Sequence, residues 1–467
     1  MGTKTLIVVA FLISSITAWT QSDQFAMAVD FLRAQPYGEV YILLGQVLLV
    51  INLSAFLWRV ILFFRYRPVE PCSDSQLPTC TVVVPAYNEG SMVFKTLESV
   101  LQSDYPADKL QIIAVDDGSA DDTWEWMKKA AAQSGGRIEA VRLAKNGGKR
   151  RALYEGFIRS RAEVLVTIDS DSLINPDTLR CLVSPFAADE KIGGVAGNVA
   201  VLNRHKDIIP RMLEVVFAYS FEFVRASQSA VNSVFCTPGA LSAYRRTAVM
   251  KVLDAWLNQT FLGRPAGIGE DRAMTNAILQ QGLHVVFQSN AVVYTTVPVR
   301  YKGLCKMFLR WARSNVRETI AMAGFIFTRF RQTPALGARV NFVLSVIQMI
   351  VPQILLAGLT GCILWHPALF ISHTLLGACL TGTVPAAFYA WRRQYSSEAL
   401  WAILYAMFWI FGLSWITPYA LVTVGNNKWL TRDVKRKRGS LRRGRLMLHL
   451  FRRAAYATVH TLAIRRF

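Results

Sequence analysis

Two aspartates separated by one serine follow an apolar run near the middle of the chain. The run is Val166-Thr167-Ile168, and the carboxylates belong to Asp169 and Asp171. A short apolar run rich in β-branched residues is typical of a buried strand, and open α/β sheets bind ligands where strands end. Two carboxylates there can hold Mg²⁺ or Mn²⁺, which serves the phosphates of a substrate. Asp-x-Asp alone is more often a solvated turn, so the neighbouring motifs must decide.

Further polar motifs accompany the two aspartates. In the segment Asn146-Gly147-Gly148-Lys149-Arg150, a flexible glycine pair stands beside two cations, so it is a candidate phosphate cradle. Each motif is weak by itself, because glycine pairs and surface cations usually have no function. Their order and spacing together are specific. The others are Val84-Pro85-Ala86-Tyr87-Asn88-Glu89, Val115-Asp116-Asp117-Gly118-Ser119, Gly269-Glu270-Asp271-Arg272 and Arg310-Trp311.

The elements that must position these motifs form an α/β domain from Cys80 to about Phe330. Short β-rich runs alternate there with helical segments, which predicts a mostly parallel, doubly wound sheet. About 250 residues suffice for one core of this kind. Glu270 is expected to open a helix. The predicted strands are Thr81–Val84, Gln111–Val115, Val164–Ile168, Gly193–Ala200 and Val285–Gln288.

Two stretches of this region are amphipathic and basic, namely Ile208–Arg225 and Tyr301–Phe330. Both mix aromatic and aliphatic residues with Arg and Lys. Such stretches are either ordinary domain helices or helices that lie in a membrane interface. The interface is favoured for the second stretch, because it leads straight into an apolar segment.

The two ends of the chain are apolar enough for membrane helices. The chain is 52% hydrophobic, with a mean hydropathy of +0.29. Tyr41–Phe64 can cross a hydrocarbon core of about 30 Å, and the arginines at its far end place that end in the cytoplasm. Leu6–Trp19 is a signal-peptide core or a short first span, and a retained span is favoured. Val340–Trp365 and Ala368–Trp391 are predicted as two more spans.

A last apolar stretch, Ala399–Val424, precedes a strongly basic tail. A single crossing would put the tail outside, against the positive-inside rule. We therefore expect a break at Gly412 or Pro418 and a return to the cytoplasmic face. The net charge of +21 comes without a nucleic-acid motif, so anionic lipid is the expected partner of the tail. Seven scattered cysteines without Cys-x-x-Cys argue against a disulfide scaffold or a zinc site.

The series of motifs resembles the membrane-embedded, processive family 2 glycosyltransferases, and among them the hyaluronan synthases most. The similarity covers about Thr81 to Thr319 and continues more weakly to the end of the chain. These matches are more specific than the general signature shared with chitin-oligosaccharide and poly-N-acetylglucosamine synthases. The closest matches are Gly148-Lys149-Arg150, Asp169-Ser170-Asp171-Ser172, Asn258-Gln259-Thr260-Phe261-Leu262-Gly263, Ile268-Gly269-Glu270-Asp271-Arg272 with Thr275-Asn276, and Arg310-Trp311 with Ser314 and Arg317-Glu318.

The resemblance implies a binding site for a UDP-sugar donor. Asp117 would recognise the uridine, and the aromatic face of Tyr87 suits stacking on the uracil. Lys149 would bind the phosphates as a point charge. Asp169 and Asp171 would hold the sugar nucleotide with its Mg²⁺ or Mn²⁺, and Asp171 would be the more direct metal ligand.

The resemblance also implies an acceptor side. Asp271 would be the general base that takes the proton of the acceptor hydroxyl in an inverting displacement. Arg310 would neutralise charge on the departing diphosphate. Trp311 would pack against the acceptor sugar at the entrance of a membrane channel, and Arg272 would belong to the substrate-binding set. Cys236 matches a cysteine near the nucleotide pocket, although a small core residue is about as good an interpretation.

Two places depart from the pattern of the resembled family. Asn427-Lys428-Trp429-Leu430-Thr431-Arg432 resembles a gating loop, in which Trp429, Thr431 and Arg432 would reach the substrate. Leu430 stands where the family has glycine, and an interfacial Trp anchor is the alternative. Met307 stands where the family motif Gln-x-x-Arg-Trp has glutamine, and methionine cannot replace the hydrogen bonds of the amide.

The resulting expectation is a GT-A-type, Rossmann-like α/β domain between membrane helices, with interfacial amphipathic helices. The predicted regions are 1–66 (two spans), 67–335 (cytoplasmic transferase), 336–425 (membrane) and 426–467 (basic cytoplasmic tail). The expected product is hyaluronan from UDP-N-acetylglucosamine and UDP-glucuronate, extruded through a multi-pass plasma or inner membrane protein. The alternatives are a single-donor chitin-oligosaccharide or poly-N-acetylglucosamine synthase and, in another class, a transporter or scaffold with a decayed transferase domain. Partners would be UDP-sugars, the growing polysaccharide and lipids, with no nucleic acid.

Overall fold

An eight-stranded sheet forms the centre of the α/β domain in the computed structural model, which describes residues 3–20, 22–393 and 397–426. The strand order is β3-β2-β1-β4-β7-β6-β10-β5. A separate hairpin pairs β8 with β9. The strands are β1 Cys80–Ala86, β2 Leu110–Asp116, β3 Ile138–Arg142, β4 Val164–Ile168, β5 Ser172–Ile174, β6 Ile192–Val201, β7 Leu241–Arg245, β8 Thr260–Phe261, β9 Arg264–Pro265 and β10 His284–Thr295.

The sheet is mostly parallel, as the alternation of strands and helices predicted. The order β3-β2-β1-β4 is parallel throughout, and β10 is parallel to β6. β7 runs antiparallel between β4 and β6, and β5 runs antiparallel along β10. Every residue of β1, β4 and β6 is buried, because helices cover a parallel sheet.

All five predicted strands are present, and three strands of the large sheet were missed. The missed strands are β3, β5 and β7. β7 escaped prediction because it is not an apolar run: its Ser242 is fully buried. The Ser242 hydroxyl lies 2.7 Å from that of Thr167 on β4, so a polar residue is satisfied inside the sheet.

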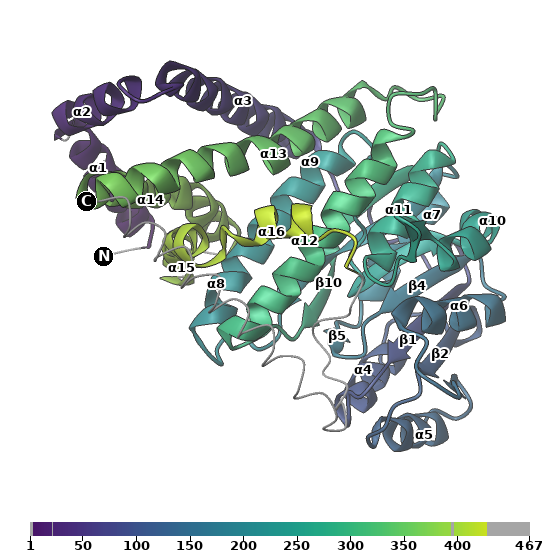
Figure 1. Cartoon of the computed structure of the whole chain (residues 1–467). Helices are drawn as coiled ribbons and strands as arrows, with labels where there is room; N and C mark the ends of the chain where they lie inside the picture. Colours follow the sequence, from purple (N-terminus) through teal and green to yellow (C-terminus); the bar gives the residue numbers. More distant parts are fainter. Residues whose placement is uncertain (1–2, 21, 394–396, 427–467) are drawn as a thin grey trace, which may run out of the picture. The chain divides into compact units, whose positions relative to one another are not determined.

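Six helices of ten to twelve residues flank the sheet, and the helix Ile208–Phe217 also packs against β6 (Figure 1). α11 begins at Glu270, as predicted. Because the carboxyl ends of parallel strands meet at one edge of a sheet, the loops after β1, β2 and β4 gather there beside the first turns of α6 and α11. The six are α4 Met92–Leu101, α5 Thr123–Gln133, α6 Lys149–Arg159, α7 Thr178–Ala188, α10 Arg246–Leu257 and α11 Glu270–Gln280.

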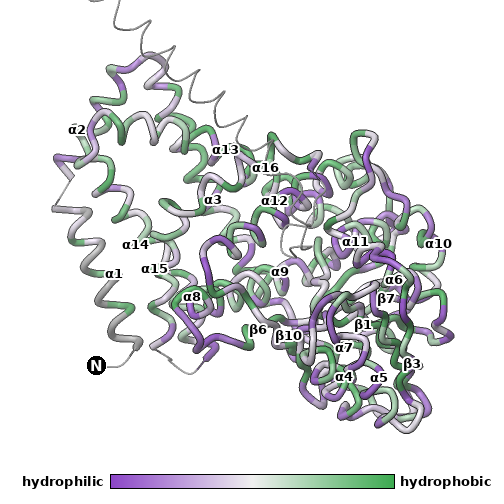
Figure 2. Tube along the Cα trace, turned by 60° about the horizontal axis from the view of Figure 1, so that its bottom comes forward, coloured by the Kyte–Doolittle hydropathy of each residue, from purple (hydrophilic) through white to green (hydrophobic). Residues whose placement is uncertain are grey.

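Three helices within the described residues are long and apolar enough to cross a membrane: Gly38–Arg65 (α3), Leu336–Trp365 (α13) and Phe370–Arg392, most of α14 Pro367–Arg392. Figure 2 shows the prevalence of hydrophobic residues along α3 and α13. The predicted first span lies within helix α1, Thr3–Thr20, and its crossing of a membrane stays a prediction. A further helix, α2 Ser22–Arg33, was not predicted.

The last apolar stretch breaks next to Gly412, one of the two predicted places. A 43° bend separates Ser397–Leu413 from α16, Ile416–Val422. A bend leaves backbone carbonyls without helical partners, which is costly unless other donors replace them. Here the Tyr301 hydroxyl and the Trp415 indole N–H both donate to the carbonyl of Gly412. The return of the tail to the cytoplasmic face stays a prediction.

The two amphipathic stretches are helical. The second forms α12, Tyr301–Ala323, which packs against α11 on one side and α16 on another (Figure 1). The first divides into α8 Ile208–Phe217, a π-helix Ala218–Val224 and α9 Arg225–Ser229. The π-helix is a wide turn of the kind that occurs often at functional sites. Their placement in a membrane interface stays a prediction.

Candidate active site

Lys149 lies at the centre of a group of carboxylates. It is the first residue of α6, after Gly148, whose φ of 87° favours glycine. Its ammonium forms an ion pair with Asp169, just beyond the end of β4, and its Nζ is 3.1 Å from Oε1 of Glu270. Burial disfavours the charged ammonium, but the attraction of Asp169 and Glu270 outweighs burial, so the pKa of Lys149 is raised. Lys149 therefore carries a full positive charge at neutral pH.

Asp117 binds the glycine loop in front of Lys149. Its side-chain oxygens accept hydrogen bonds from the amides of Gly147, at 2.7 Å, and Gly148, at 2.8 Å. The carboxyl group is buried, and the amide of Asp117 donates to the carbonyl of Ala86, beside Tyr87. The structure thus brings the predicted uridine-binding pair next to the predicted phosphate cradle. It also gives Asp117 a second contact, with the loop itself.

Asp271 lies in the first turn of α11. Its Oδ2 accepts from the amide of Gly239 at 3.2 Å and lies 3.9 Å from Sγ of Cys236, while its Oδ1 accepts from the amide of Arg272. Gly269 is the N-cap of the helix; its φ is 69°, and a Cβ there would clash with the Ser314 side chain. Only glycine therefore brings α11 this close to α12.

The environment tunes the titratable groups around Asp271. Burial and then the negative charge of Glu270 raise the pKa of Asp271, which suits a base that must take up a proton. Burial works against the charge of Glu270 too, but the ammonium of Lys149 and the backbone of α11 lower its pKa. Burial, followed by the charge of Asp271, raises the pKa of the Cys236 thiol to about 12. Cys236 is therefore protonated at neutral pH.

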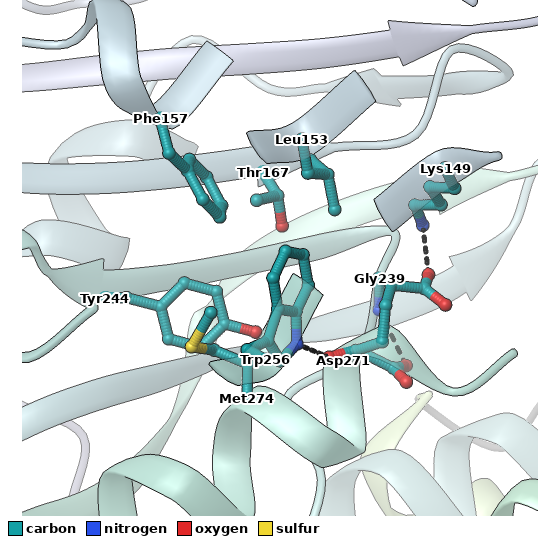
Figure 3. A pocket seen from close by; sticks show the side chains of 10 residues that line it. Lys149, Leu153, Phe157, Thr167, Gly239, Tyr244, Trp256, Asp271 and Met274 are labelled. Carbon is teal, nitrogen blue, oxygen red and sulfur yellow. Dashed lines mark hydrogen bonds and ion pairs between the residues drawn. The ribbon is translucent and has the colours of Figure 1, made fainter. Parts of the chain in front are cut away.

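A small cavity lies behind these charges (Figure 3). Aromatic and aliphatic side chains form half of its lining, and they contribute to the burial that affects the carboxylates. The Trp256 indole N–H donates to the carbonyl of Glu270 at 2.8 Å and so fixes the start of α11. The lining residues are Lys149, Leu153, Phe157, Thr167, Gly239, Tyr244, Trp256, Glu270, Asp271 and Met274.

The predicted metal ligands follow β4, with oxygen as the only donor atom. One oxygen of Asp169 pairs with Lys149, and Oδ1 of Asp171 is 3.4 Å from the hydroxyl oxygens of Ser172 and Thr295. Within the described part of the chain, no group of three His, Cys, Asp or Glu side chains could hold an ion alone. Mg²⁺ commonly takes one or two carboxylates and completes its shell with phosphate and water. The pair therefore fits a cation that is shared with a diphosphate.

The remaining predicted residues lie on α11 and α12. Arg310 is close enough to Glu270 for its charge to lower the pKa of that carboxyl group. Trp311 is 38% exposed, with its ring 5.6 Å from that of Phe308 and 6.0 Å from that of Phe217. Arg272 binds side chains of α12, including the Thr319 hydroxyl at 3.0 Å, and so ties α11 to α12.

A buried polar network locks α11 and α12 together below the site. The Arg317–Glu318 ion pair measures 2.8 Å, with both side chains almost fully buried. Glu318 also accepts from the side-chain amides of Gln259, at 3.2 Å, and Asn276, at 3.1 Å. Because these bonds join residues of α11 and α12, the network can hold the two helices in one arrangement. Met307 of α12 is buried as well.

Several residues of the site have no role in the sequence-based prediction. Glu270 pairs with Lys149, Gly239 contacts Asp271, and Trp256 binds the start of α11. Glu270 had one signal, its place beside Asp271 at a helix N-terminus, where negative charge is stabilised. The predicted gating residues Trp429, Thr431 and Arg432 lie outside the described residues.

Comparisons with known proteins identify the family and the relatives that this chain resembles. Residues 78–314 match the family model described as "Glycosyltransferase like family 2". An N-acetylglucosaminyltransferase of Mesorhizobium japonicum is 32% identical over 376 residues, which are 78% of this chain and 84% of that protein. A hyaluronan synthase of Streptococcus pyogenes serotype M3 is 30% identical over 438 residues, which are 92% of this chain and 97% of that protein.

Among solved structures, a mannosyltransferase from Pyrobaculum calidifontis in complex with GDP-Man and Mn²⁺ superimposes with a TM-score of 0.52. Its sequence is 21% identical, and the match covers 79% of this chain and 99% of that one. At this identity the likeness shows the fold, a GT-A-like α/β arrangement.

Proposed function

Because this chain belongs to glycosyltransferase family 2, we propose that it transfers sugars from UDP-sugars to the end of a growing β-linked polysaccharide, which it moves across a membrane. The observation that carries this proposal is the placement of Lys149. Its ammonium lies between Asp169 and Glu270, and Glu270 adjoins Asp271. The same cluster thus contains the Lys149 ammonium, which can bind phosphate, and Asp271, which can act as the base for the acceptor hydroxyl.

The donor would occupy the edge where β1, β2 and β4 end. Tyr87 and Asp117 would receive the uridine, and Lys149 would exchange part of its pairing with Asp169 for the diphosphate. Asp169 and Asp171 would hold a bound Mg²⁺ or Mn²⁺. When bound, that cation supplies electrostatic stabilisation for the charge on the leaving diphosphate.

The acceptor hydroxyl would lie against Asp271. The raised pKa of this carboxyl group strengthens it as a base, and the amide of Gly239 and the thiol of Cys236 hold its orientation. Arg310, near Glu270, would stabilise the negative charge of the departing UDP. Trp311, a partly exposed aromatic residue, would receive the acceptor sugar.

Hyaluronan is the first choice of product. The similarity to the hyaluronan synthase extends over 92% of this chain and so includes membrane helices beyond the catalytic domain. In this proposal the catalytic domain faces the cytoplasm, where UDP-sugars are made, and the spans export the product. The regions 1–66, 67–335, 336–425 and 426–467 keep the roles proposed from the sequence.

A single-sugar polymer is the second candidate. The relative from Mesorhizobium japonicum is named an N-acetylglucosaminyltransferase and has 32% identity. Met307, which stands where the resembled motif has glutamine, is buried on α12, one helical turn before Arg310 and Trp311. A changed contact at Met307 affects which sugar the enzyme accepts more directly than it affects the type of reaction.

Membranes that contain the protein, incubated with each UDP-sugar alone and in pairs, test the proposal. Polymer that forms only from UDP-N-acetylglucosamine with UDP-glucuronate identifies hyaluronan, and polymer from one donor identifies the second candidate. Absence of UDP release with every donor and with Mg²⁺ or Mn²⁺ would refute the catalytic proposal and favour a transporter or scaffold. Asp271→Asn serves as the inactive control.

A further inference from the structure

Arg225 lies directly behind the loop that holds Asp271. It begins α9, immediately after the π-helix. Its Nε donates to the carbonyl of Cys236 at 3.0 Å, and the Cys236 thiol in turn contacts Asp271. The centre of the guanidinium group is 3.9 Å from the centroid of the Phe221 ring. Arg225 thus stands one residue away from the proposed base.

The charge of Arg225 is only partly satisfied. Its Nη1 atom is buried and has no hydrogen-bond partner among the described residues. Burial is also the main cause that lowers the pKa of the Arg225 guanidinium, yet an arginine side chain stays charged in proteins. A buried donor without an acceptor costs stability, so such a group calls for an explanation such as a ligand.

Aromatic rings connect Arg225 to Trp311, which is proposed to pack against the acceptor sugar. The ring of Phe221 is 4.9 Å from that of Phe217, whose ring is 6.0 Å from that of Trp311. A series of contacts therefore leads from Asp271 through Cys236 to Arg225, and from Arg225 through the two Phe rings to Trp311. A sugar that packs on Trp311 and presents a hydroxyl to Asp271 would have Arg225 beside it.

We infer that Arg225 binds an oxygen of a carbonyl or carboxylate group carried by the terminal sugar of the acceptor. The two sources of this chemistry are the N-acetyl group of an amino sugar and the carboxylate of a uronate. A guanidinium group suits both, because it donates several hydrogen bonds in one plane. The inference rests on the proposed function and adds a recognition residue to it.

The test uses the full-length protein with three β-linked oligosaccharides, whose terminal sugar is N-acetylglucosamine, glucuronate or plain glucose. The variants are Arg225→Gln and Arg225→Lys. Arg211→Gln is the matched control, since Arg211 lies on α8 and contacts Trp401 and Glu398. For each acceptor, kcat and KM are measured at a saturating donor concentration, and donor hydrolysis without acceptor reports that the variant is folded.

The wild type should bind one or both of the acyl-bearing acceptors more tightly than the glucose-terminated one. Arg225→Gln should raise the KM for the preferred acceptor about tenfold or more, as expected for one charged hydrogen bond, with little change for glucose. The KM of Arg225→Lys for this acceptor should lie between those of the wild type and Arg225→Gln. The KM of Arg211→Gln should equal that of the wild type. The acceptor that loses its advantage identifies the N-acetyl or the carboxylate source.

Three results would overturn the inference. The first is that the wild type has the same KM for all three acceptors, or that it binds none of them. The second is an equal fall of kcat for all acceptors in Arg225→Gln, with a shifted pH profile, because the residue would then act through Asp271. The third is unchanged discrimination in that variant. Failure of the wild type to release UDP at all would instead refute the proposed function.

Discussion

Gly239 and Lys149 are packed so closely that a Cβ on Gly239 would lie 2.5 Å from the Nζ of Lys149. The same Cβ would be 3.6 Å from the carboxylate of Glu270 and 3.8 Å from that of Asp169. The absence of a side chain at Gly239 therefore makes room for the ammonium group between its two partners.

Gly239→Ala should weaken donor binding with little loss of stability. The Lys149 side chain can bend away from the new methyl group, so the fold should lose no more than about 1 kcal/mol. The ammonium would, however, leave its place beside Asp169. We expect the KM for the UDP-sugar to rise about tenfold. Gly194→Ala is the control, since its Cβ would make ordinary contacts of 3.5 Å; equal kinetics of the two variants would contradict the prediction.

Lys149→Met should reduce both stability and activity. Removal of the ammonium leaves Glu270 buried without its ion-pair partner, which typically costs about 3 kcal/mol. The double variant Lys149→Met/Glu270→Gln should recover part of the melting temperature but none of the UDP release. The exposed Lys145 supplies a control, because Lys145→Met removes the same charge from the neighbouring loop. A double variant no more stable than the single one would argue against the ion pair.

Asp271 should set the acid limb of the pH–rate profile. Burial and the charge of Glu270 raise its pKa, and the base works only when ionised, so kcat/KM should fall on acidification above the usual carboxylate range. Glu270→Gln removes the negative charge of Glu270, so the pKa of Asp271 should fall and the acid limb should move to lower pH. A limb that stays in place would exclude Asp271 as the titrating group or Glu270 as its modulator.

Asp271→Asn should abolish transfer without lowering the melting temperature at neutral pH. A carboxyl group whose pKa is raised by folding favours the folded state in its protonated form, and this contribution is lost as pH rises. The neutral amide avoids that loss. Thermal unfolding at acidic and neutral pH checks the sign: the wild type should approach the variant in stability as the pH falls. Residual polymer synthesis would remove Asp271 as the base.

Thr423 should stabilise the junction between α12 and α16. Its hydroxyl oxygen accepts two hydrogen bonds from the buried Arg313, at 3.1 Å and 3.0 Å. Thr423→Val keeps the shape but leaves the guanidinium without this acceptor, at a cost of about 1–3 kcal/mol. Thr423→Ser keeps the acceptor and should unfold like the wild type. Equal thermal unfolding of the two variants in detergent would show that the contact is unimportant.

The parts of the fold that the sequence predicted are those with strong local signals. The β1, β2 and β4 strands are apolar runs that end in polar motifs, and the break near Gly412 follows from a glycine in an apolar stretch. β7 could not be seen, because it is short and Ser242 interrupts its apolar pattern. The buried hydroxyls of Ser242 and Tyr244 are satisfied by Thr167 and Thr237, from elsewhere in the chain.

The candidate site was likewise predicted only in part. Its motifs name Asp169, Lys149 and Asp271, but sequence gives no distance between residues on β4, α6 and α11. The pairing of Lys149 with Glu270 depends on two helix N-termini that point at one spot. The position of Arg225 depends on a π-helix, which no simple period of apolar residues signals.

That π-helix fixes the rotational phase of the chain on either side of it. Phe217 faces Trp311 before the seven residues of the wide turn, and Arg225 reaches the Cys236 carbonyl after them. In an α-helix each residue advances the chain by roughly 100°, so the loss of one residue from Ala218–Val224 would swing Arg225 away from Cys236 while Phe217 stayed in place. The number of residues in this segment, as well as their types, therefore determines where Arg225 lies in the site.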